Sequence, residues 1–418
     1  MKNIIYILFL IGNAMFAQQT ISLQECYQAL DSNHPLLKQG ISIDKQNELD
    51  VAILATKKKP IIELVAQGNL LSDVTSLPIT LPNITIEKPN LFQYKAYANV
   101  NQLIYDGGLL KATIKANKNT NLSKKKALEV SIYQNRVQIN QLYFSVLLLQ
   151  EKDSLLNDKL TLLNAKLKEV KAGIKYGVLL PSQDAILEAE RLKVLQNSAD
   201  VVIVKTQLKQ TLSTIIQRDV TKAVFKPIAI NLSLSDDLDR PELELFQLKK
   251  DEINLNSEIF DHKNAPKLFG FAQGGIGNPA LNMLDNSLQP YYIVGLKLKW
   301  NPFDWHATKK EKEKVLINKE IINNQKEIFE LQTKIALDKQ IAEINRIKTL
   351  LLSDKNIIKL RKKVLKTVAS QLKNGVVTTS IYITELNNLN EAKTILKTHK
   401  IQSQLAKANY NTLLGNTK

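Results

Sequence analysis

The residues most suited to chemistry are four histidines and one cysteine, and their spacing supports neither catalysis nor metal binding. The histidines lie far apart in the chain, at His34, His262, His306 and His399, without the close spacing of metal ligands. The sequence contains no glycine-rich phosphate loop, no nucleophile elbow and no cluster of cysteine and histidine. Cys26 has no second cysteine with which to form an intramolecular disulfide. We therefore predict no catalytic residue, no cofactor and no metal site, which argues against an enzyme.

The first 17 residues have the pattern of a secretory signal. A lysine at position 2 precedes an apolar run over residues 4–11, and a short segment then ends at Ala17. The apolar run is too short to span a bilayer as a helix, so a membrane anchor is the less favoured alternative. Cys26 follows a glutamine and a glutamate, which is not the small, apolar context of a lipoprotein cysteine. We predict export, with cleavage of a signal peptide (1–17) after Ala17.

The composition is that of a charged chain with few helix breakers. Of the 418 residues, 44% are hydrophobic and 23% are charged, with 14 glycines and 12 prolines. The formal net charge of +17 raises the question of a nucleic-acid partner. An export signal argues against such a partner, and the lysines are spread along predicted helices with glutamates and asparagines among them. We interpret them as solvated helix faces and predict no nucleic-acid partner.

Two stretches, at 109–172 and 306–374, contain neither glycine nor proline. Both are rich in leucine, lysine, isoleucine, glutamine, glutamate and alanine, a composition that favours helix. With a rise of 1.5 Å per residue, a helix of about 65 residues extends about 100 Å. A compact globular domain needs no helix of that length, so we predict a coiled-coil or tube-like structure.

The first of these stretches carries the apolar stripe of a coiled coil. Apolar residues recur at alternating steps of four and three, with Asp153 as the exception. The stripe comprises Leu142, Val146, Leu149, Asp153, Leu156, Leu160, Leu163, Leu167, Val170 and Ile174. Beyond it, Gly177 and Pro181 predict the tight turn of an antiparallel helical hairpin, with Pro181 in the first turn of the returning helix. On the returning helix the same alternation predicts a seam of Ala185, Ala189, Leu192, Gln196, Ala199 and Ile203.

The second half of the chain repeats the plan of the first. The starts of the long helices, Asp106 and Asp304, are 304 − 106 = 198 residues apart, and the turn glycines Gly177 and Gly375 are also 375 − 177 = 198 apart. Equal offsets predict long helices of equal length. Seven of the ten seam positions stay apolar after this shift, which favours a tandem duplication. We predict a first repeat at 18–216, an extended equatorial connector at 217–239, a second repeat at 240–415 and a tail at 416–418.

A pair of strands precedes each long helix. The first pair is expected at 61–70 and 92–105, and the second at 267–276 and 294–300, with a loop at 277–290. The strands alternate apolar and polar residues, as membrane-spanning strands of about ten residues do. Four strands cannot close a barrel, because barrels of this kind have at least about eight, so we predict a barrel shared between chains. Three chains would supply twelve strands.

Several segments carry a family resemblance when taken in order. They are 22–30 (SLQECYQAL) with Asn33-His34-Pro35 after it, 102–108 (QLIYDGG) with its echo at 300–304 (WNPFD), and the two hairpin turns. Over nearly the whole mature chain, this order resembles the TolC family of outer-membrane efflux proteins. The resemblance implies a mainly α fold with a β-barrel portion: long antiparallel helical hairpins that form a trimeric α-barrel tunnel in the periplasm, and a shared 12-stranded barrel in the outer membrane.

The same resemblance implies a function and partners. The chain would be the passive exit duct of a tripartite efflux or type I secretion system. Its partners would be two further copies of itself in a homotrimer, a periplasmic adaptor, an inner-membrane transporter and outer-membrane lipid.

The resemblance also implies candidate site residues. The adaptor would dock on two hairpin tips, which comprise Tyr176, Gly177, Val178, Leu179, Leu180, Pro181 and Ser182 in the first repeat and Asn374, Gly375, Val376, Val377, Thr378, Thr379 and Ser380 in the second. Candidates for a tunnel constriction are Asp184, Thr384 and Glu385; an acidic ring would favour cations, although each acid also fits a solvated charge at a helix end. Family members often carry an arginine four residues before the tip glycine, where this chain has Gly173 and Gln371, so the closing mechanism does not transfer by residue.

Two other classes of envelope protein also have long helices. A periplasmic coiled-coil adaptor has one hairpin per chain, flanked by long soluble β-domains, whereas this sequence predicts two hairpins and two short strand pairs. A structural envelope protein built as a coiled coil needs no strand pairs at equivalent positions of two repeats. We favour the channel and keep these two classes as alternatives.

Overall fold

The structure, a computed structural model, describes residues 20–75, 88–232 and 237–416. The predicted signal peptide lies outside these ranges, as do parts of the first strand-pair loop, of the connector and of the predicted tail. The chain divides into two compact units. Of the described residues, one unit contains 20–39, 127–232, 237–243 and 327–416, and the other contains 40–75, 88–126 and 244–326.

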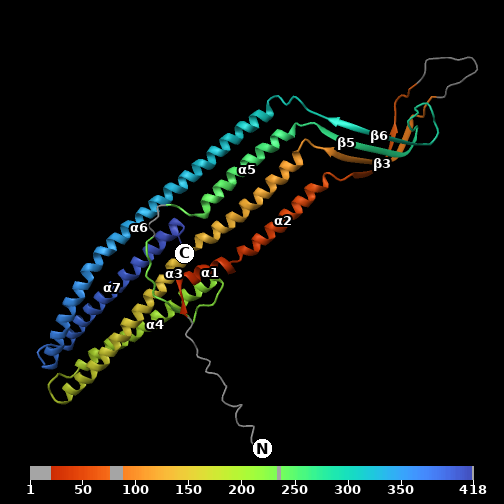
Figure 1. The fold of residues 1–418 in the computed structure, drawn as a ribbon. Coiled ribbons are helices and arrows are strands. Elements are labelled where there is room, and N and C mark those ends of the chain that lie inside the picture. Colours follow the sequence, from red (N-terminus) through yellow and green to blue (C-terminus); the bar gives the residue numbers. More distant parts are fainter. Residues whose placement is uncertain (1–19, 76–87, 233–236, 417–418) are drawn as a thin grey trace, which may run out of the picture. The chain divides into compact units, whose positions relative to one another are not determined.

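Two helical hairpins dominate the chain: α4 folds back along α3, and α7 folds back along α6 (Figure 1). α3 (Leu109–Lys175) and α6 (Ala307–Lys373) have 67 residues each, and their ends are offset by the 198 residues of the repeat. The prediction of long helices of equal length is therefore confirmed. The remaining helices are α1 (Leu23–Asn33), α2 (Leu36–Thr56), α4 (Gln183–Ile216), α5 (Pro241–Lys263) and α7 (Thr379–Leu414).

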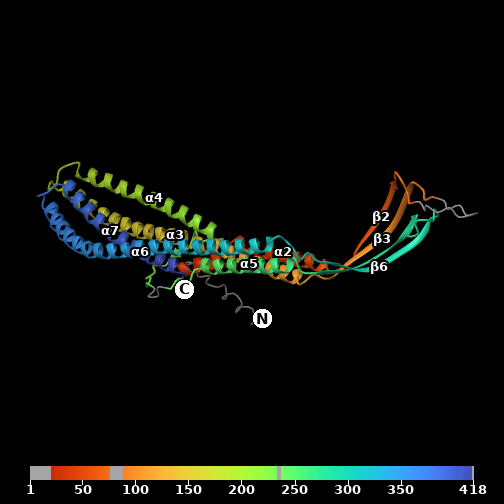
Figure 2. The ribbon, with the colours of Figure 1, turned by 90° about the horizontal axis from the view of Figure 1, so that it is seen from above.

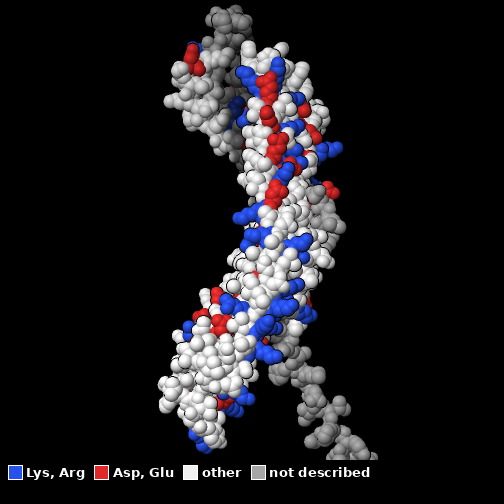
Figure 3. Space-filling model, turned by 90° about the vertical axis from the view of Figure 1, so that its left-hand side faces the viewer, with Lys and Arg blue, Asp and Glu red and all other residues white. Residues whose placement is uncertain are grey.

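The visible helix surface carries charges of both signs among uncharged residues (Figure 3). In Figure 3, lysine and arginine side chains lie over the visible face with aspartate and glutamate among them. Some of these charges pair within one helix, as Lys166 does with Glu169. Within the ranges that the structure describes, no helix carries an apolar stretch long enough to cross a membrane.

The seam predicted on α3 packs as expected. Leu163 and Val170 are buried near the hairpin turn, and Leu142 and Val146 are buried in a second cluster with α1 and the connector. The cluster near the turn, which contains Leu163 and Val170, also contains residues of α4, α6 and α7. The two hairpins therefore share one core there. Burying these side chains supplies the driving force that holds the long helices together, at about 25 cal/mol per Å² of apolar surface.

The seam predicted on the returning helix α4 is wrong. All six of its residues are exposed, and Ile203 is 66% exposed. α4 instead buries the face that contains Leu187, Val194 and Val201. Both faces have apolar residues at helical spacing, so the spacing alone does not indicate which face packs against α3.

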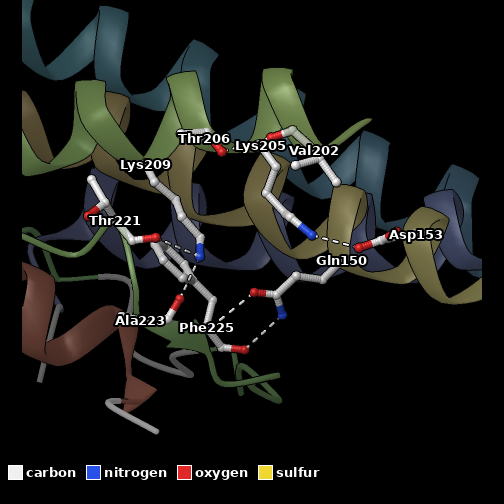
Figure 4. A network of polar contacts seen from close by, with 9 residues as sticks. All are labelled: Gln150, Asp153, Val202, Lys205, Thr206, Lys209, Thr221, Ala223 and Phe225. Carbon is white, nitrogen blue, oxygen red and sulfur yellow. Dashed lines mark hydrogen bonds and ion pairs between the residues drawn. The ribbon is translucent and has the colours of Figure 1, made fainter. Parts of the chain in front are cut away.

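Polar residues within the seams have partners on the returning helices. Asp153 of α3 lies 2.7 Å from the Nζ atom of Lys205 in α4 (Figure 4). In the second hairpin, the Oδ2 atom of Asp354 lies 2.7 Å from the Nδ1 atom of His399. The half-buried carboxylate of Asp153 loses hydration, and the Lys205 ammonium across the seam offsets part of that loss.

A short parallel sheet attaches the start of the described chain to the connector. β1 (Thr20–Ile21) pairs with β4 (Val224–Phe225), and neither strand was predicted from the sequence. Phe225 is buried, and its backbone N–H and C=O each bond to the side chain of Gln150 in α3 at 3.1 Å (Figure 4). Lys209 of α4 donates to two further carbonyl oxygens of the connector. These bonds hold the connector against α3 and α4.

The second unit contains an antiparallel sheet in the order β2-β3-β5-β6. Its strands are β2 (Ile61–Leu70), β3 (Phe92–Tyr105), β5 (Lys267–Asn278) and β6 (Gln289–Lys299), and they are curved (Figure 2). The bounds predicted for the first pair are confirmed. β5 ends two residues later than predicted and β6 begins five residues earlier, so the predicted loop is too long. Backbone pairing continues there beyond the end of the alternating side-chain pattern.

The sheet has one apolar face and one polar face. Directly opposite residues in an antiparallel pair point to the same side, so the register sorts the side chains of all four strands. One face contains Leu64, Ala98, Val294 and their neighbours, and no charged residue of the four strands, which the structure describes in full, lies on it. The predicted alternation is confirmed.

The boundaries predicted between strands and long helices are helix caps. The Oδ1 atom of Asp106 accepts a hydrogen bond from the backbone N–H of Gly108 at 3.0 Å, and its Oδ2 atom accepts one from Leu110 at 2.6 Å. In the second repeat, Asp304 accepts from the backbone N–H of Thr308 at 2.9 Å, and hydrogen bonds from Thr308 lower the pKa of Asp304. These carboxylates accept hydrogen bonds from N–H groups that have no partner within the helix. Their negative charge also interacts favourably with the positive end of the helix dipole.

Candidate functional site: the two hairpin tips

Both hairpin tips begin with the same helix cap. Gly177 and Gly375 end the long helices in the left-handed region, with φ values of +73° and +71°. At the first tip, the N–H of Val178 donates to the carbonyl of Gly173 at 2.9 Å. At the second, the N–H of Val376 donates to Gln371 at 2.9 Å, which is the same bond shifted by 198 residues. A left-handed glycine after the last turn is a common way to satisfy the final carbonyls of a helix, because glycine has no Cβ to strain.

The first tip is packed against its own helix. Leu179 folds back and is buried, and a Cβ atom at Gly173 would lie only 2.8 Å from its Cδ1 atom. Gly173 therefore makes room for Leu179. This contact explains why the position four before the tip glycine holds no large side chain in this repeat.

A buried hydrogen bond joins the two tips. The Oε1 atom of Gln183, the first residue of α4, accepts from the hydroxyl of Thr379 at 2.8 Å and from its backbone N–H at 3.3 Å. Thr379 is fully buried and Gln183 is nearly so. Thr379 belongs to the predicted second tip, whereas Gln183 was not predicted as a site residue, because an amide next to a turn gives no sign of its distant partner.

The remaining tip residues form an exposed surface. Tyr176, Val178, Leu180 and Val376 are between 56% and 77% exposed, which is unusual for apolar side chains grouped on two neighbouring turns. Pro181 precedes α4 by two residues, so its predicted position in the first turn of the helix is wrong.

The residues predicted for a constriction follow the tips on α4 and α7. The Oδ1 atom of Asp184 accepts a hydrogen bond from the next backbone N–H, and Thr384 is exposed. Glu385 lies across the seam of the second hairpin, 3.2 Å from the Nη1 atom of Arg361, and accepts a bond from Asn388 at 3.1 Å. The charge of Glu385 is therefore paired within the chain. A constriction at these residues stays a prediction.

Three of the four histidines, His34, His262 and His399, have hydrogen-bond partners within the chain. The Nδ1 atom of His262 lies 2.7 Å from the carbonyl oxygen of Gly107, and His399 pairs with Asp354. His34 accepts a hydrogen bond from the backbone N–H two residues later. In the described part of the chain, no group of three or more histidine, cysteine, aspartate or glutamate residues could hold a metal ion.

Comparisons with known proteins gave matches by structure. Neither the known protein families nor the curated proteins include one that matches the sequence. The outer membrane protein VceC from Vibrio cholerae matches with a TM-score of 0.65 and 11% identity, over 94% of this chain and 96% of its own. CusC matches with a TM-score of 0.66 and 12% identity, over 97% and 95%. The CmeC outer membrane channel of Campylobacter jejuni matches with a TM-score of 0.63 and 15% identity, over 95% and 87%.

This chain has the TolC-type outer-membrane channel fold. Because each match covers at least 94% of the chain, the TolC-type fold includes both hairpins and both strand pairs. The predicted fold of long antiparallel hairpins and strand pairs is confirmed for the single chain, and the homotrimer stays a prediction. At 11–15% identity, the TolC-type fold is retained with few shared residues, so the tips must be interpreted from their own contacts.

Proposed function

We propose that this chain is the outer-membrane channel subunit of an export system, a passive exit duct for substrates that other proteins deliver. The observation that carries the proposal is the sheet, which has an uncharged apolar face on one side and a polar face on the other. Strands that span a membrane need an apolar face toward lipid and tolerate a polar face toward a water-filled lumen. The likeness in fold to VceC and CmeC, an outer membrane protein and an outer membrane channel, supports the same location.

A homotrimer would complete the barrel. In the chain, β2 and β6 are the two edges of the sheet. Unpaired edges expose backbone groups that must find partners inside a membrane. Three copies that pair β6 of one chain with β2 of the next would give twelve strands without an edge. The exposed apolar residues of α4 and α6, such as Ile203 and Leu352, would then be covered by neighbouring subunits.

Exposed aromatic residues suggest where the membrane ends. Trp300, Phe303 and Trp305 lie between β6 and α6, and Trp305 is 92% exposed. Aromatic side chains are enriched where a membrane-spanning barrel meets water. On this proposal they contact the lipid headgroups of the periplasmic leaflet, with the hairpins extending into the periplasm.

The hairpin tips would receive the periplasmic adaptor, and an inner-membrane transporter would deliver the substrate. This is the arrangement of a tripartite efflux or type I secretion system. The exposed apolar side chains of Tyr176, Val178, Leu180 and Val376 support a protein partner, because an isolated tip has no other reason to keep them in water.

Replacing the tip glycines tests the docking. A Cβ atom at Gly177 would meet nothing within 4 Å, and one at Gly375 would meet only the carbonyl of Val178 at 3.3 Å. The double variant Gly177→Trp/Gly375→Trp should therefore assemble and yet abolish transport, because the indoles block close approach of the adaptor. Gly177→Ala/Gly375→Ala has the same backbone cost and should retain most transport. Full transport by the tryptophan variant would rule out docking at the tips.

Fractionation tests the location and assembly. The channel should require detergent for extraction and migrate as a heat-modifiable trimer. A water-soluble monomer in the periplasmic fraction would overturn the proposal and favour a periplasmic adaptor.

A further inference from the structure

The polar face of the sheet carries an excess of positive charge. The charged residues of the four strands are Glu63, Lys95, Lys267, Lys297 and Lys299. The register places all five on the same face, opposite the apolar one. Because the strands are described in full, this face holds four lysines and one glutamate.

Three of these residues, Lys267, Lys297 and Lys299, form a lysine cluster at the end of the sheet nearest the helices. Lys267 is directly opposite Lys299 in the β5–β6 pair, and Lys297 is the next residue of β6 on the same face. Like charges opposite one another destabilise a strand pair. Within the described part of the chain, the lysine cluster forms no ion pair. Its repulsion is therefore not relieved by the fold.

The other two charges do not neutralise the lysine cluster. Lys95 lies toward the opposite end of the sheet, with its Nζ atom 6.0 Å from the centre of the Tyr291 ring. Glu63 is on β2 and accepts a bond from Asn99 at 3.4 Å. Even when each Glu63 neutralises one lysine of a neighbouring chain, three unpaired lysines per chain remain on the polar face.

We propose that the lysine cluster forms an electropositive ring in the channel lumen and makes anionic solutes the preferred cargo of the barrel. This inference rests on the proposed channel function, since the polar face becomes a lumen only in a closed barrel. Rings of lysine or arginine favour anions in pores, and low-dielectric walls focus their field. In a trimer the ring contains nine lysines from three clusters.

The strength of the preference depends on salt. Charges on a wall act over about 10 Å at 0.1 M ionic strength and about 30 Å at 0.01 M. A wide lumen should therefore discriminate between ions at low salt and lose that discrimination at high salt.

Reversal potentials across a planar bilayer test the proposal. The purified full-length protein, inserted in a neutral bilayer under a tenfold KCl gradient up to 0.1 M, should show preference for chloride over potassium. Lys267→Glu/Lys297→Glu/Lys299→Glu should shift the reversal potential to the cation side. The glutamine triple variant removes the three positive charges without adding negative ones (Lys267→Gln/Lys297→Gln/Lys299→Gln). It should shift the reversal potential in the same direction by a smaller amount.

Two controls separate the lysine cluster from other charges. Lys57→Glu/Lys58→Glu/Lys59→Glu makes the same change in net charge on the turn before β2 and should shift the potential less. Asp184→Asn tests the tip, and a shift there with none from the lysine cluster would overturn the inference. Cation preference in the unaltered channel, or equal shifts from both lysine triples, would also overturn it. Absence of any conductance would contradict the proposed channel function itself.

Discussion

Trp305 has the left-handed backbone conformation of Gly107, the residue 198 positions earlier in the chain. Their φ values are +53° and +69°, and the next residues, His306 and Gly108, have φ values of +63° and +89°. Each repeat therefore makes the same turn from strand to long helix, with two glycines in one copy and a tryptophan and a histidine in the other. A left-handed conformation costs a non-glycine residue about 1–2 kcal/mol, so the second turn is strained where the first is not.

Substitutions at the two turns should have opposite effects on stability. Trp305→Gly removes backbone strain and should stabilise the protein by about 1 kcal/mol against unfolding. Gly107→Ala should destabilise it by more, because the new Cβ would collide with the Cβ atom of Ala265 in addition to the conformational cost. Urea unfolding in detergent measures both. Destabilisation by Trp305→Gly would mean that the exposed indole contributes more to stability than the strained backbone costs.

The capping box at the start of α1 predicts a dependence of stability on pH. The hydroxyl of Ser22 accepts from the backbone N–H of Glu25 at 3.2 Å, and the Glu25 carboxylate accepts from the backbone N–H of Ser22 at 2.6 Å. The hydrogen bonds from Ser22, the backbone N–H foremost, lower the pKa of Glu25 below its ordinary 4.5. The stabilisation is therefore complete above pH 4.5 and is lost as the pH falls through the lowered pKa.

Glu25→Gln should flatten that part of the pH profile. At pH 7, Ser22→Ala should cost about 1 kcal/mol, the usual effect of losing an N-cap. Unfolding midpoints between pH 3 and 7 provide the measurement, and Gln24→Ala, on the exposed side of the same helix, is the control. An unchanged pH profile in Glu25→Gln would contradict the assignment.

The single cysteine should report on unfolding. Cys26 is fully buried in α1, and burial raises the pKa of its thiol to about 12. Only the thiolate reacts readily, so the native protein should resist maleimide and disulfide reagents at pH 8. Labelling should appear with the unfolding transition. Fast labelling of the native protein would show that the core around α1 opens. The Cys26→Ser variant has no thiol and serves as the background control.

The sequence predicted those features that follow from local patterns. Breaker-free stretches gave both long helices, and alternating residues gave β2 and β3 to the residue. The face of α4 that packs could not be predicted, because Leu192 and Leu187 obey the same spacing and only the partner helix distinguishes them. The bond between Gln183 and Thr379 joins residues 196 apart, and no local signal reports on it. β1 and β4 are two residues long, too short for any periodic pattern.

The hydrogen bond between Gln183 and Thr379 should couple the stability of the two tips. Gln183→Leu leaves the fully buried hydroxyl of Thr379 without its acceptor, which costs about 1–3 kcal/mol. The double variant Gln183→Leu/Thr379→Val replaces both partners with apolar groups of similar shape and should recover most of that loss. Thr384→Val is the matched control, because the Thr384 hydroxyl is exposed and bonds only within its own helix. Hydrogen exchange at 176–182 and 374–380 should accelerate in Gln183→Leu and return toward the original rate in the double variant. If the effects of the two substitutions on the exchange rates are additive, the bond does not couple the tips. Opening one hairpin tip would then not require the other to follow.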